Sequence, residues 1–122
     1  MKSVTFENQA SKVLSAIGNP FRIKIIFIIG KGEACVCHLE AVLKKRQAYI
    51  SQHLMALRKA GLLKTRREGK YIFYRLSDYE IINLIRKAGL ISGLEPDQLS
   101  EIKKPDLLKK CFCPHCRSKN YP

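Results

Sequence analysis

The sequence predicts a mainly α-helical fold with one small β-hairpin, in the order of a winged helix-turn-helix. Two helical stretches separated by a short basic turn are followed by two runs of β-forming residues. The charge agrees with this order, because residues 44–75 contain ten basic residues and one acidic residue in a chain of net charge +13. A basic concentration of this kind is typical of proteins that bind nucleic acid.

The length of 122 residues suits a single domain with an extension. We expect a DNA-binding domain over residues 1–90 and a C-terminal extension with a cysteine-rich tail over residues 91–122. No apolar run is long enough to span a membrane, and the N-terminus lacks the pattern of a signal peptide. We therefore expect a cytoplasmic protein without a membrane partner. The sequence shows no nucleophile–base pair, paired catalytic carboxylates or glycine-rich phosphate loop, so an enzyme is not indicated.

Helical spacing of apolar residues predicts a first helix over residues 4–17, ended by Gly18. Asn19-Pro20 follows, which supplies an N-cap and a proline suited to the first position of a second helix. This second helix is apolar on almost every side, as expected of the most buried helix of a small domain. We expect residues 33–37 to be extended and residues 39–43 to form a short helix.

The rest of the domain contains one longer helix, a hairpin and a final helix. The longer helix is predicted over residues 47–60. The runs 62–67 and 70–76 are rich in β-forming residues and predict the hairpin. A capping-box pattern over residues 77–80 then predicts the start of the last helix, which should end near residues 87–88.

The N-terminal part of helix 47–60 is the part of a recognition helix that meets base edges. Glutamine amides there can pair with adenine, and a serine hydroxyl can contact a base or a phosphate. The expected contacts on this helix are Gln47, Ala48, Tyr49, Ser51 and Gln52. Basic residues before the helix and around the hairpin tip are expected to contact phosphates: Lys44, Lys45, Arg46, Arg66, Arg67 and Lys70. The predicted partner is double-stranded DNA, bound with a steep dependence on salt.

The five cysteines fall into two groups, Cys35 with Cys37, and the tail residues Cys111, Cys113 and Cys116. In a reducing compartment, clustered thiols favour metal ligation or redox chemistry. The first two sulfurs can act together only in extended backbone or at an irregular helix start, since continuous α-helix would separate them by about 200°. Two thiolates do not complete a soft-metal site: arsenite or antimonite would take three, and cadmium, lead or zinc three or four.

Three arrangements of these thiols are open. In the favoured one, tail cysteines complete the site begun by Cys35 and Cys37, with His38 as a weaker candidate ligand. In the second, the tail cysteines form their own site with His115. In the third, the cysteines form a redox sensor that oxidises in place of binding metal.

Three stretches of the sequence resemble the arsenic-repressor (ArsR/SmtB) family: EACVCHL (33–39), ISQHLMALRKAGL (50–62) and REGKYIFYRL (67–76). The resemblance implies a winged-helix transcriptional repressor that is a homodimer through the first and last helices of the core. It also implies binding to operator DNA without metal and release when a metal or metalloid binds as inducer. No organic cofactor is implied.

The thiol motif of that family commonly reads E-L-C-V-C-D-L. Cys35 and Cys37 match it, whereas Ala34 replaces the leucine and His38 replaces the aspartate. Some members have a third cysteine three residues after the second, and here that position is Glu40. The resemblance therefore implies a thiol pair that needs further ligands.

A second family site uses a D-x-H pair and two later ligands on the last core helix. Asp78 matches the aspartate, but Glu80 stands in place of the histidine, and Ile91 and Leu94 fall at the later positions. The resemblance thus implies that this interhelical zinc site is absent. Arg46 falls where many members have serine, which implies a weaker helix cap and more charge.

Overall fold

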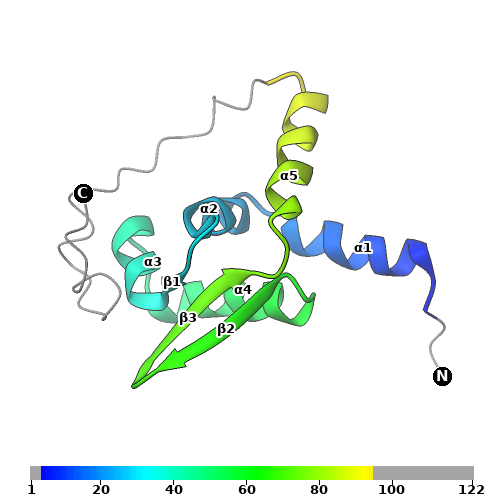
Figure 1. Ribbon diagram of the computed structural model, residues 1–122. Coiled ribbons are helices and arrows are strands. Elements are labelled where there is room, and N and C mark those ends of the chain that lie inside the picture. Colours follow the sequence, from blue (N-terminus) through cyan, green and yellow to red (C-terminus); the bar gives the residue numbers. More distant parts are fainter. Residues whose placement is uncertain (1–3, 95–122) are drawn as a thin grey trace.

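The computed structural model describes residues 4–94, and the arrangement of its elements is shown in Figure 1. This part of the chain contains five helices and one antiparallel sheet of three strands in the order β1-β3-β2. The predicted fold class, mainly α with a small β-hairpin, is confirmed. The elements are α1 (Phe6–Ile17), α2 (Pro20–Ile29), β1 (Ala34–Cys35), α3 (Val36–Leu43), α4 (Gln47–Lys59), β2 (Leu63–Glu68), β3 (Tyr71–Leu76) and α5 (Glu80–Ile91).

The first two helices begin at side-chain caps. Helix α1 begins at Phe6, two residues later than predicted, because the Thr5 hydroxyl accepts the Asn8 N–H at 3.1 Å. Helix α2 begins as predicted: the Asn19 side chain accepts the N–H of the second and third helical residues at 2.8 and 3.2 Å, and Pro20 occupies the first position.

The segment that follows α2 departs from the prediction. Only Ala34 and Cys35 are extended, and α3 already begins at Val36 instead of residue 39. The cause is the Cys35 side chain, whose Sγ accepts the backbone N–H of His38 at 3.4 Å and so caps the helix. The two extended residues pair with the centre of β3, in the register Cys35 to Phe73, and add a third strand to the hairpin.

Helix α4 and the hairpin lie where the sequence predicted them, to within one residue at each end. The last pair of the hairpin joins Glu68 to Tyr71, so Gly69 and Lys70 form a two-residue turn. Gly69 has φ of +62°, which fits the glycine at the first central position of such turns. We call this hairpin, residues 63–76, the wing.

The capping box predicted over residues 77–80 is wrong. The Ser77 hydroxyl donates to the carbonyl of Gly61 at 2.7 Å, so it does not cap α5. Instead, the Asp78 carboxylate accepts the N–H of Glu80 at 2.9 Å, where the helix begins. The helix continues to Ile91, beyond the predicted end near residues 87–88, and ends before Gly93, whose φ is +94°.

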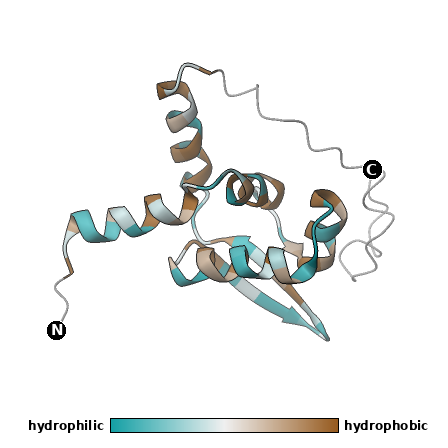
Figure 2. Cartoon of the chain, turned by 180° about the vertical axis from the view of Figure 1, so that it is seen from behind, coloured by the Kyte–Doolittle hydropathy of each residue, from teal (hydrophilic) through white to brown (hydrophobic). Residues whose placement is uncertain are grey.

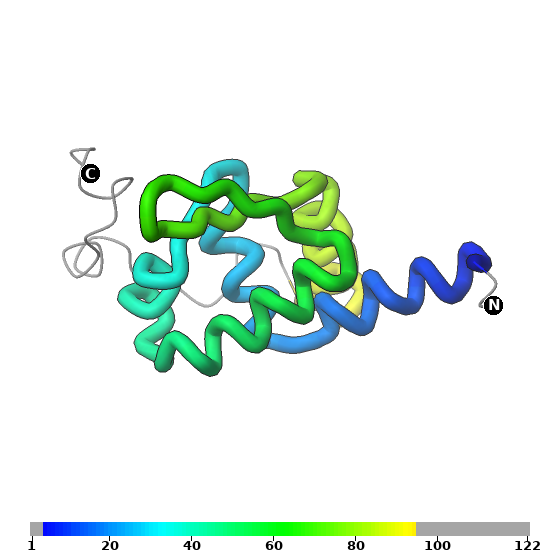
Figure 3. Tube along the Cα trace, turned by 90° about the horizontal axis from the view of Figure 1, so that it is seen from below, coloured from blue at the N-terminus to red at the C-terminus, as the bar shows by residue number. Residues whose placement is uncertain are grey.

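The main core lies between the helices and one face of the sheet. Its members with at most 1% of their surface exposed come from α2, α3 and α4: Ile25, Ile26, Leu39, Ile50, Leu54 and Leu57. Figures 1 and 3 show α1 extending away from this body, on the side opposite the wing tip and α3. No helix within residues 4–94 has both the length and the apolar character needed to cross a membrane.

Several large apolar side chains of α1, α5 and their flanks remain exposed in the single chain. Figure 2 shows the hydrophobic residues along α5, which contrast with the mainly hydrophilic strand β2 of the wing. We call this set the apolar helix face: Val4, Phe6, Leu14, Leu84, Leu90, Ile91 and Leu94. Exposed apolar surface of this extent is typical of a protein–protein contact.

Candidate metal-thiol site and nucleic-acid interface

Cys35 and Cys37 lie together at the junction of β1 and α3. Cys35 is the N-cap of the helix and Cys37 its second residue, and their Sγ atoms are 2.8 Å apart. This is the irregular helix start at which the sequence allowed the two sulfurs to act together. The Cys35 Sγ accepts the backbone N–H of His38 at 3.4 Å, so the thiol pair sits at the N-terminus of α3.

The thiol pair belongs to a small apolar cluster that is separate from the main core. Cys35 is 2% exposed and packs on the fully buried ring of Phe73, while Cys37 and Tyr71 pack on the same cluster. Val36, between the two cysteines, packs on the main core instead. The cluster therefore lies on the outer face of the sheet.

Within residues 4–94, no group of three or more histidine, cysteine, aspartate or glutamate side chains is placed to hold a metal ion. The described residues thus bring together two thiols of the predicted set and no third ligand. The tail candidates Cys111, Cys113, His115 and Cys116 lie outside the described residues. Two thiolates fit part of the donor set of a soft metal, and the remaining ligands would have to come from beyond this part of the chain.

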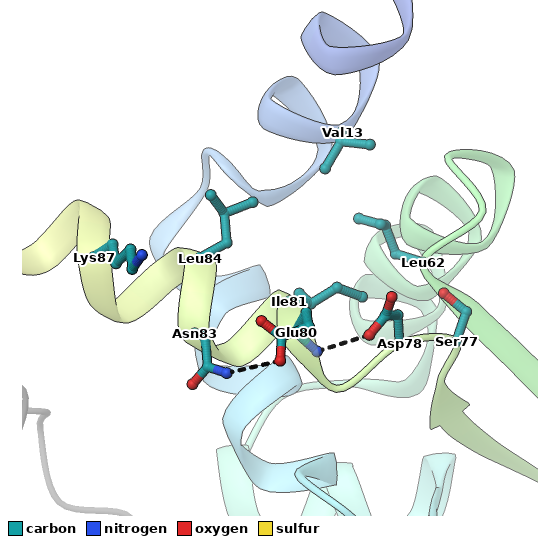
Figure 4. Close-up of a pocket in the computed structure, with 9 residues that line it drawn as sticks. All are labelled: Val13, Leu62, Ser77, Asp78, Glu80, Ile81, Asn83, Leu84 and Lys87. Atoms are coloured by element: carbon teal, nitrogen blue, oxygen red, sulfur yellow. Dashed lines mark hydrogen bonds between the residues drawn. The ribbon is translucent and has the colours of Figure 1, made fainter.

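Asp78 and Glu80, at the first two positions of the second family site, line a hollow between α1 and the start of α5 (Figure 4). Its polar groups bond to their neighbours: the Asp78 carboxylate accepts from the Glu80 backbone, and the Glu80 carboxylate accepts from Asn83 Nδ2 at 3.2 Å. Its apolar wall includes Val13 and Leu84. These contacts give the two carboxylates structural partners at the start of α5.

The basic turn 44–46 connects α3 to α4 and lies beside the thiol site. Lys44 ends α3 in the left-handed conformation, with φ 56° and ψ 43°. Arg46 is the N-cap of α4 and makes no side-chain cap hydrogen bond, as the sequence implied. An open groove runs from the turn to Cys37, and it is lined by Cys37, Glu40, Ala41, Lys44, Lys45 and Arg46.

The predicted recognition residues of α4 lie at the surface. Seven of the eight predicted contacts from Lys44 to Gln52 are exposed, and Ser51 is partly exposed. The ring of Tyr49 packs against the rings of Phe21 and His53, whose centroids are 4.9 and 4.8 Å from its own. The Lys45 ammonium lies 5.8 Å from the Tyr49 ring centroid. Tyr49 is therefore a fixed feature of this surface.

His53 is a buried residue of α4. It is 9% exposed, and its Nδ1 accepts the Nε–H of Arg22 at 3.0 Å. Arg22 also donates to the carbonyl of Ala16 at 3.1 Å, so this arginine connects α1, α2 and α4. Burial, and the nearby Arg22 charge, lower the pKa of His53. No sequence pattern indicated the Arg22 contact, because the two residues are 31 positions apart.

The basic residues of the wing have different surroundings. Arg67 and Lys70 are exposed near the tip, and the Lys70 ammonium lies 5.5 Å from the ring centroid of Tyr71. The Arg66 guanidinium, by contrast, forms ion pairs with Glu33 at 2.7 Å and Glu68 at 2.9 Å. All six predicted phosphate contacts are exposed, and their contact with DNA stays a prediction.

This fold, with a basic turn, a recognition helix and a basic wing, defines a winged-helix DNA-binding regulator. Residues 19–65 match the family model described as "Bacterial regulatory protein, arsR family". The chain is 36% identical over 81 residues to a cadmium resistance transcriptional regulatory protein CadC homolog of Staphylococcus aureus, covering 66% of this chain and 67% of that protein. The chain belongs to the ArsR/SmtB family, as the three stretches of its sequence indicated.

Two further similarities agree with this assignment. The chain is 38% identical over 69 residues to the arsenical resistance operon repressor of Escherichia coli K12, covering 56% of this chain and 59% of that protein. The structure of reduced HlyU from Vibrio cholerae N16961 is 33% identical with a TM-score of 0.62, covering 70% of this chain and 90% of that chain. Proteins of this family regulate transcription and are not enzymes.

Proposed function

We propose that this protein is a metal- or metalloid-responsive transcriptional repressor that binds operator DNA as a homodimer. The observation that carries the proposal is the pair of sulfurs, 2.8 Å apart, at the start of the helix that leads into the basic turn before α4. The names of two relatives, which refer to cadmium and arsenical resistance, support an inducer of the soft class. The candidate inducers are arsenite or antimonite, cadmium, lead and zinc.

Cys35 and Cys37 would supply two thiolates of the metal site, and tail cysteines among Cys111, Cys113 and Cys116 would supply the rest. A soft ion bound there would join the tail to α3. Helix α3 is eight residues long and ends directly at the basic turn, so a shift at its first turn reaches the start of α4. Induction requires that this closed arrangement suits the DNA-free protein better than the DNA-bound one.

The apolar helix face supports dimerisation through α1 and α5. Phe6 is 85% exposed and Ile91 is 88% exposed. Both lie on amphipathic helices, whose large apolar side chains are normally covered by another part of a protein. A second copy of the chain would cover this face and the hollow of Figure 4. It would also place two recognition helices on one DNA duplex, as the half-sites of an operator require.

The metal proposal is tested by titrating the full-length protein with cadmium, while thiolate-to-metal absorption and release of operator DNA are recorded. Wild type should show three or four thiolates per ion and lose DNA affinity when loaded. The Cys35→Ser/Cys37→Ser variant should lose both responses. A second variant with Cys111, Cys113 and Cys116 changed to serine keeps the length and charge of the tail, and it should retain at most two thiolates and lose induction.

If each variant kept a fully coordinated ion, the shared site would be wrong and two separate sites would remain. If neither cadmium, lead, zinc, arsenite nor antimonite weakened DNA binding, the metal-responsive function itself would be wrong. Measurement in a reducing buffer keeps oxidation from producing either result.

A thiol redox-responsive repressor of the same fold is the second candidate. The 2.8 Å approach of the two sulfurs also suits oxidation, in which the two thiols lose two protons and two electrons to a peroxide and form a disulfide. Release of DNA by hydrogen peroxide, reversed by dithiothreitol and absent in Cys37→Ser, would favour this candidate. Release by cadmium under reducing conditions would favour the metal sensor.

A further inference from the structure

The Arg66 side chain is held by two carboxylates on the outer face of the sheet. Its Nε donates to both carboxylate oxygens of Glu33 at 3.2 and 3.0 Å, and Nη2 donates to Oε1 of Glu33 at 2.7 Å. Nη1 donates to Oε1 of Glu68 at 2.9 Å. Every guanidinium nitrogen of Arg66 thus has a carboxylate partner.

The charge of this group argues against a phosphate contact. Glu33 and Glu68 together carry two negative charges against one positive charge on Arg66, so a DNA phosphate would meet a net negative group. The hydrogen bonds to Glu33, followed by the one to Glu68, raise the pKa of Arg66, so the guanidinium stays charged and paired. Bidentate arginine–carboxylate pairs also have a fixed geometry, which suits a positioning role.

The same arginine is connected to the thiol pair through the sheet. Phe73 of the central strand lies opposite Cys35 of β1 and opposite Arg66 of β2. Directly opposed residues of neighbouring strands present their side chains on one face, so these three form a row across the sheet. The guanidinium carbon lies 4.6 Å from the Phe73 ring centroid, while Cys35 packs on the same buried ring. Glu33 lies two residues before Cys35.

We propose that Arg66 is a positioning residue, which fixes the wing to the thiol-bearing segment through Glu33 and Phe73, and that it is not a phosphate contact. The proposal rests on the DNA-binding function proposed above. Because the row begins at Cys35, the angle of the wing depends on the position of the thiol segment. A change at the thiols would therefore alter DNA binding through the wing as well as through α4.

The test compares four variants of the full-length, metal-free protein for operator affinity over a series of salt concentrations. The variants are Arg66→Gln, Arg66→Lys, Glu33→Gln and the double variant Glu33→Gln/Arg66→Gln. A positioning role predicts that each single change weakens binding about tenfold, since an unfixed wing must be ordered on binding. The dependence of log affinity on log salt should keep its slope, and the double variant should bind no worse than the single ones.

A phosphate contact predicts the opposite pattern. Arg66→Gln would then make the slope shallower by about 1.8 for two contacts per dimer. Arg66→Lys would bind like wild type, because the charge remains. Glu33→Gln would bind DNA more tightly, because a competing carboxylate is gone. Any of these results would overturn the positioning role.

A measurement without DNA keeps the proposal separate from the metal-sensing function. Amide hydrogen exchange at Gly69 and Tyr71 should accelerate in Glu33→Gln and Arg66→Lys, because the wing loses the side-chain link between Arg66 and Glu33. Unchanged exchange in both variants would reject the attachment. A failure of metal to release DNA would leave this result unaffected, so the two proposals fail independently.

Discussion

Lys44 combines a backbone strain and a charge at the same position in the basic turn. Its φ of 56° lies in the left-handed region. A residue with a Cβ atom is about 1–2 kcal/mol less stable in this conformation than in the right-handed one, a cost that glycine does not have. Lys44→Gly should therefore raise the free energy of unfolding by up to about 1 kcal/mol, after the extra flexibility of glycine in the unfolded chain is allowed for. Urea denaturation measures this change.

Lys44→Gln is the matched control, since it removes the charge and keeps the strain. It should leave stability near that of wild type, and both variants should bind DNA with a shallower salt dependence if Lys44 contacts a phosphate. Equal stability of the two variants would show that the turn gains nothing from glycine.

His53 makes the stability of the domain depend on pH. Burial and Arg22 lower the pKa of His53 in the folded protein, so the folded state binds a proton less readily than the unfolded one. The stability that neutral His53 contributes is fully present above the unfolded pKa of about 6.5, and it is lost as pH falls below that value. Acidification from pH 7.5 to 5.5 should therefore destabilise the wild type.

His53→Asn offers an acceptor for Arg22 and does not titrate. Its free energy of unfolding should fall less than that of wild type over the same pH range, as followed by thermal or urea denaturation. Parallel pH profiles would show that His53 is not the titrating group.

Two glycines in different elements should respond in opposite ways to alanine. Gly69 in the wing turn has φ of +62°, so Gly69→Ala should destabilise the fold by about 1 kcal/mol although nothing lies within 4 Å of the new Cβ. Gly89 lies inside α5, also with nothing within 4 Å, and Gly89→Ala should stabilise the helix by about 0.5–1 kcal/mol. Thermal unfolding of both variants measures these opposite changes in stability. A lower stability in both variants would contradict the prediction.

Elements whose ends depend on neighbouring residues could be predicted from the sequence. Asn19-Pro20 carries its cap within three residues, and the start of α2 was predicted correctly. The start of α5 was not, because Ser77 bonds to the carbonyl of Gly61, a partner 16 positions away. Extended backbone at Ala34 and Cys35 was predicted, but their pairing with β3 was not, because the partner residues lie about 40 positions further along the chain.

The candidate site shows the same division. The thiol pair and the basic turn follow from the type and spacing of residues in the sequence. The approach of the two sulfurs depends on Cys35 acting as a helix cap. The sequence was compatible with this irregular helix start and with extended backbone, and it did not distinguish the two. The pairing of Arg66 with Glu33 joins residues 33 positions apart, so no local pattern indicated it, and the sequence predicted a phosphate contact for Arg66.

At the scale of the whole molecule, the apolar helix face predicts the oligomeric state. Ile91→Glu would place a charge on a side chain that is 88% exposed in the single chain and buried in the proposed dimer. We expect it to shift the protein towards the monomer in sedimentation velocity and to weaken operator binding with it. Met55→Glu on α4 is the control, since Met55 is 58% exposed and lies outside that face.

Sedimentation of Met55→Glu should match that of the wild-type dimer. A dimer of unchanged strength in Ile91→Glu would mean that another surface joins the two copies. The far-ultraviolet circular dichroism of both variants should equal that of wild type, since neither side chain belongs to the core.

The two faces of the sheet pack against different groups of residues. One face closes the core that holds the domain together, whereas Cys35 and Phe73 form a separate cluster on the other. A substitution at the partly buried Cys37 therefore leaves the main core untouched, whereas Cys35 caps α3 and Phe73 is fully buried. The ligands near Cys37 can therefore change, and with them the ion that is bound, without a change in the packing of the main core.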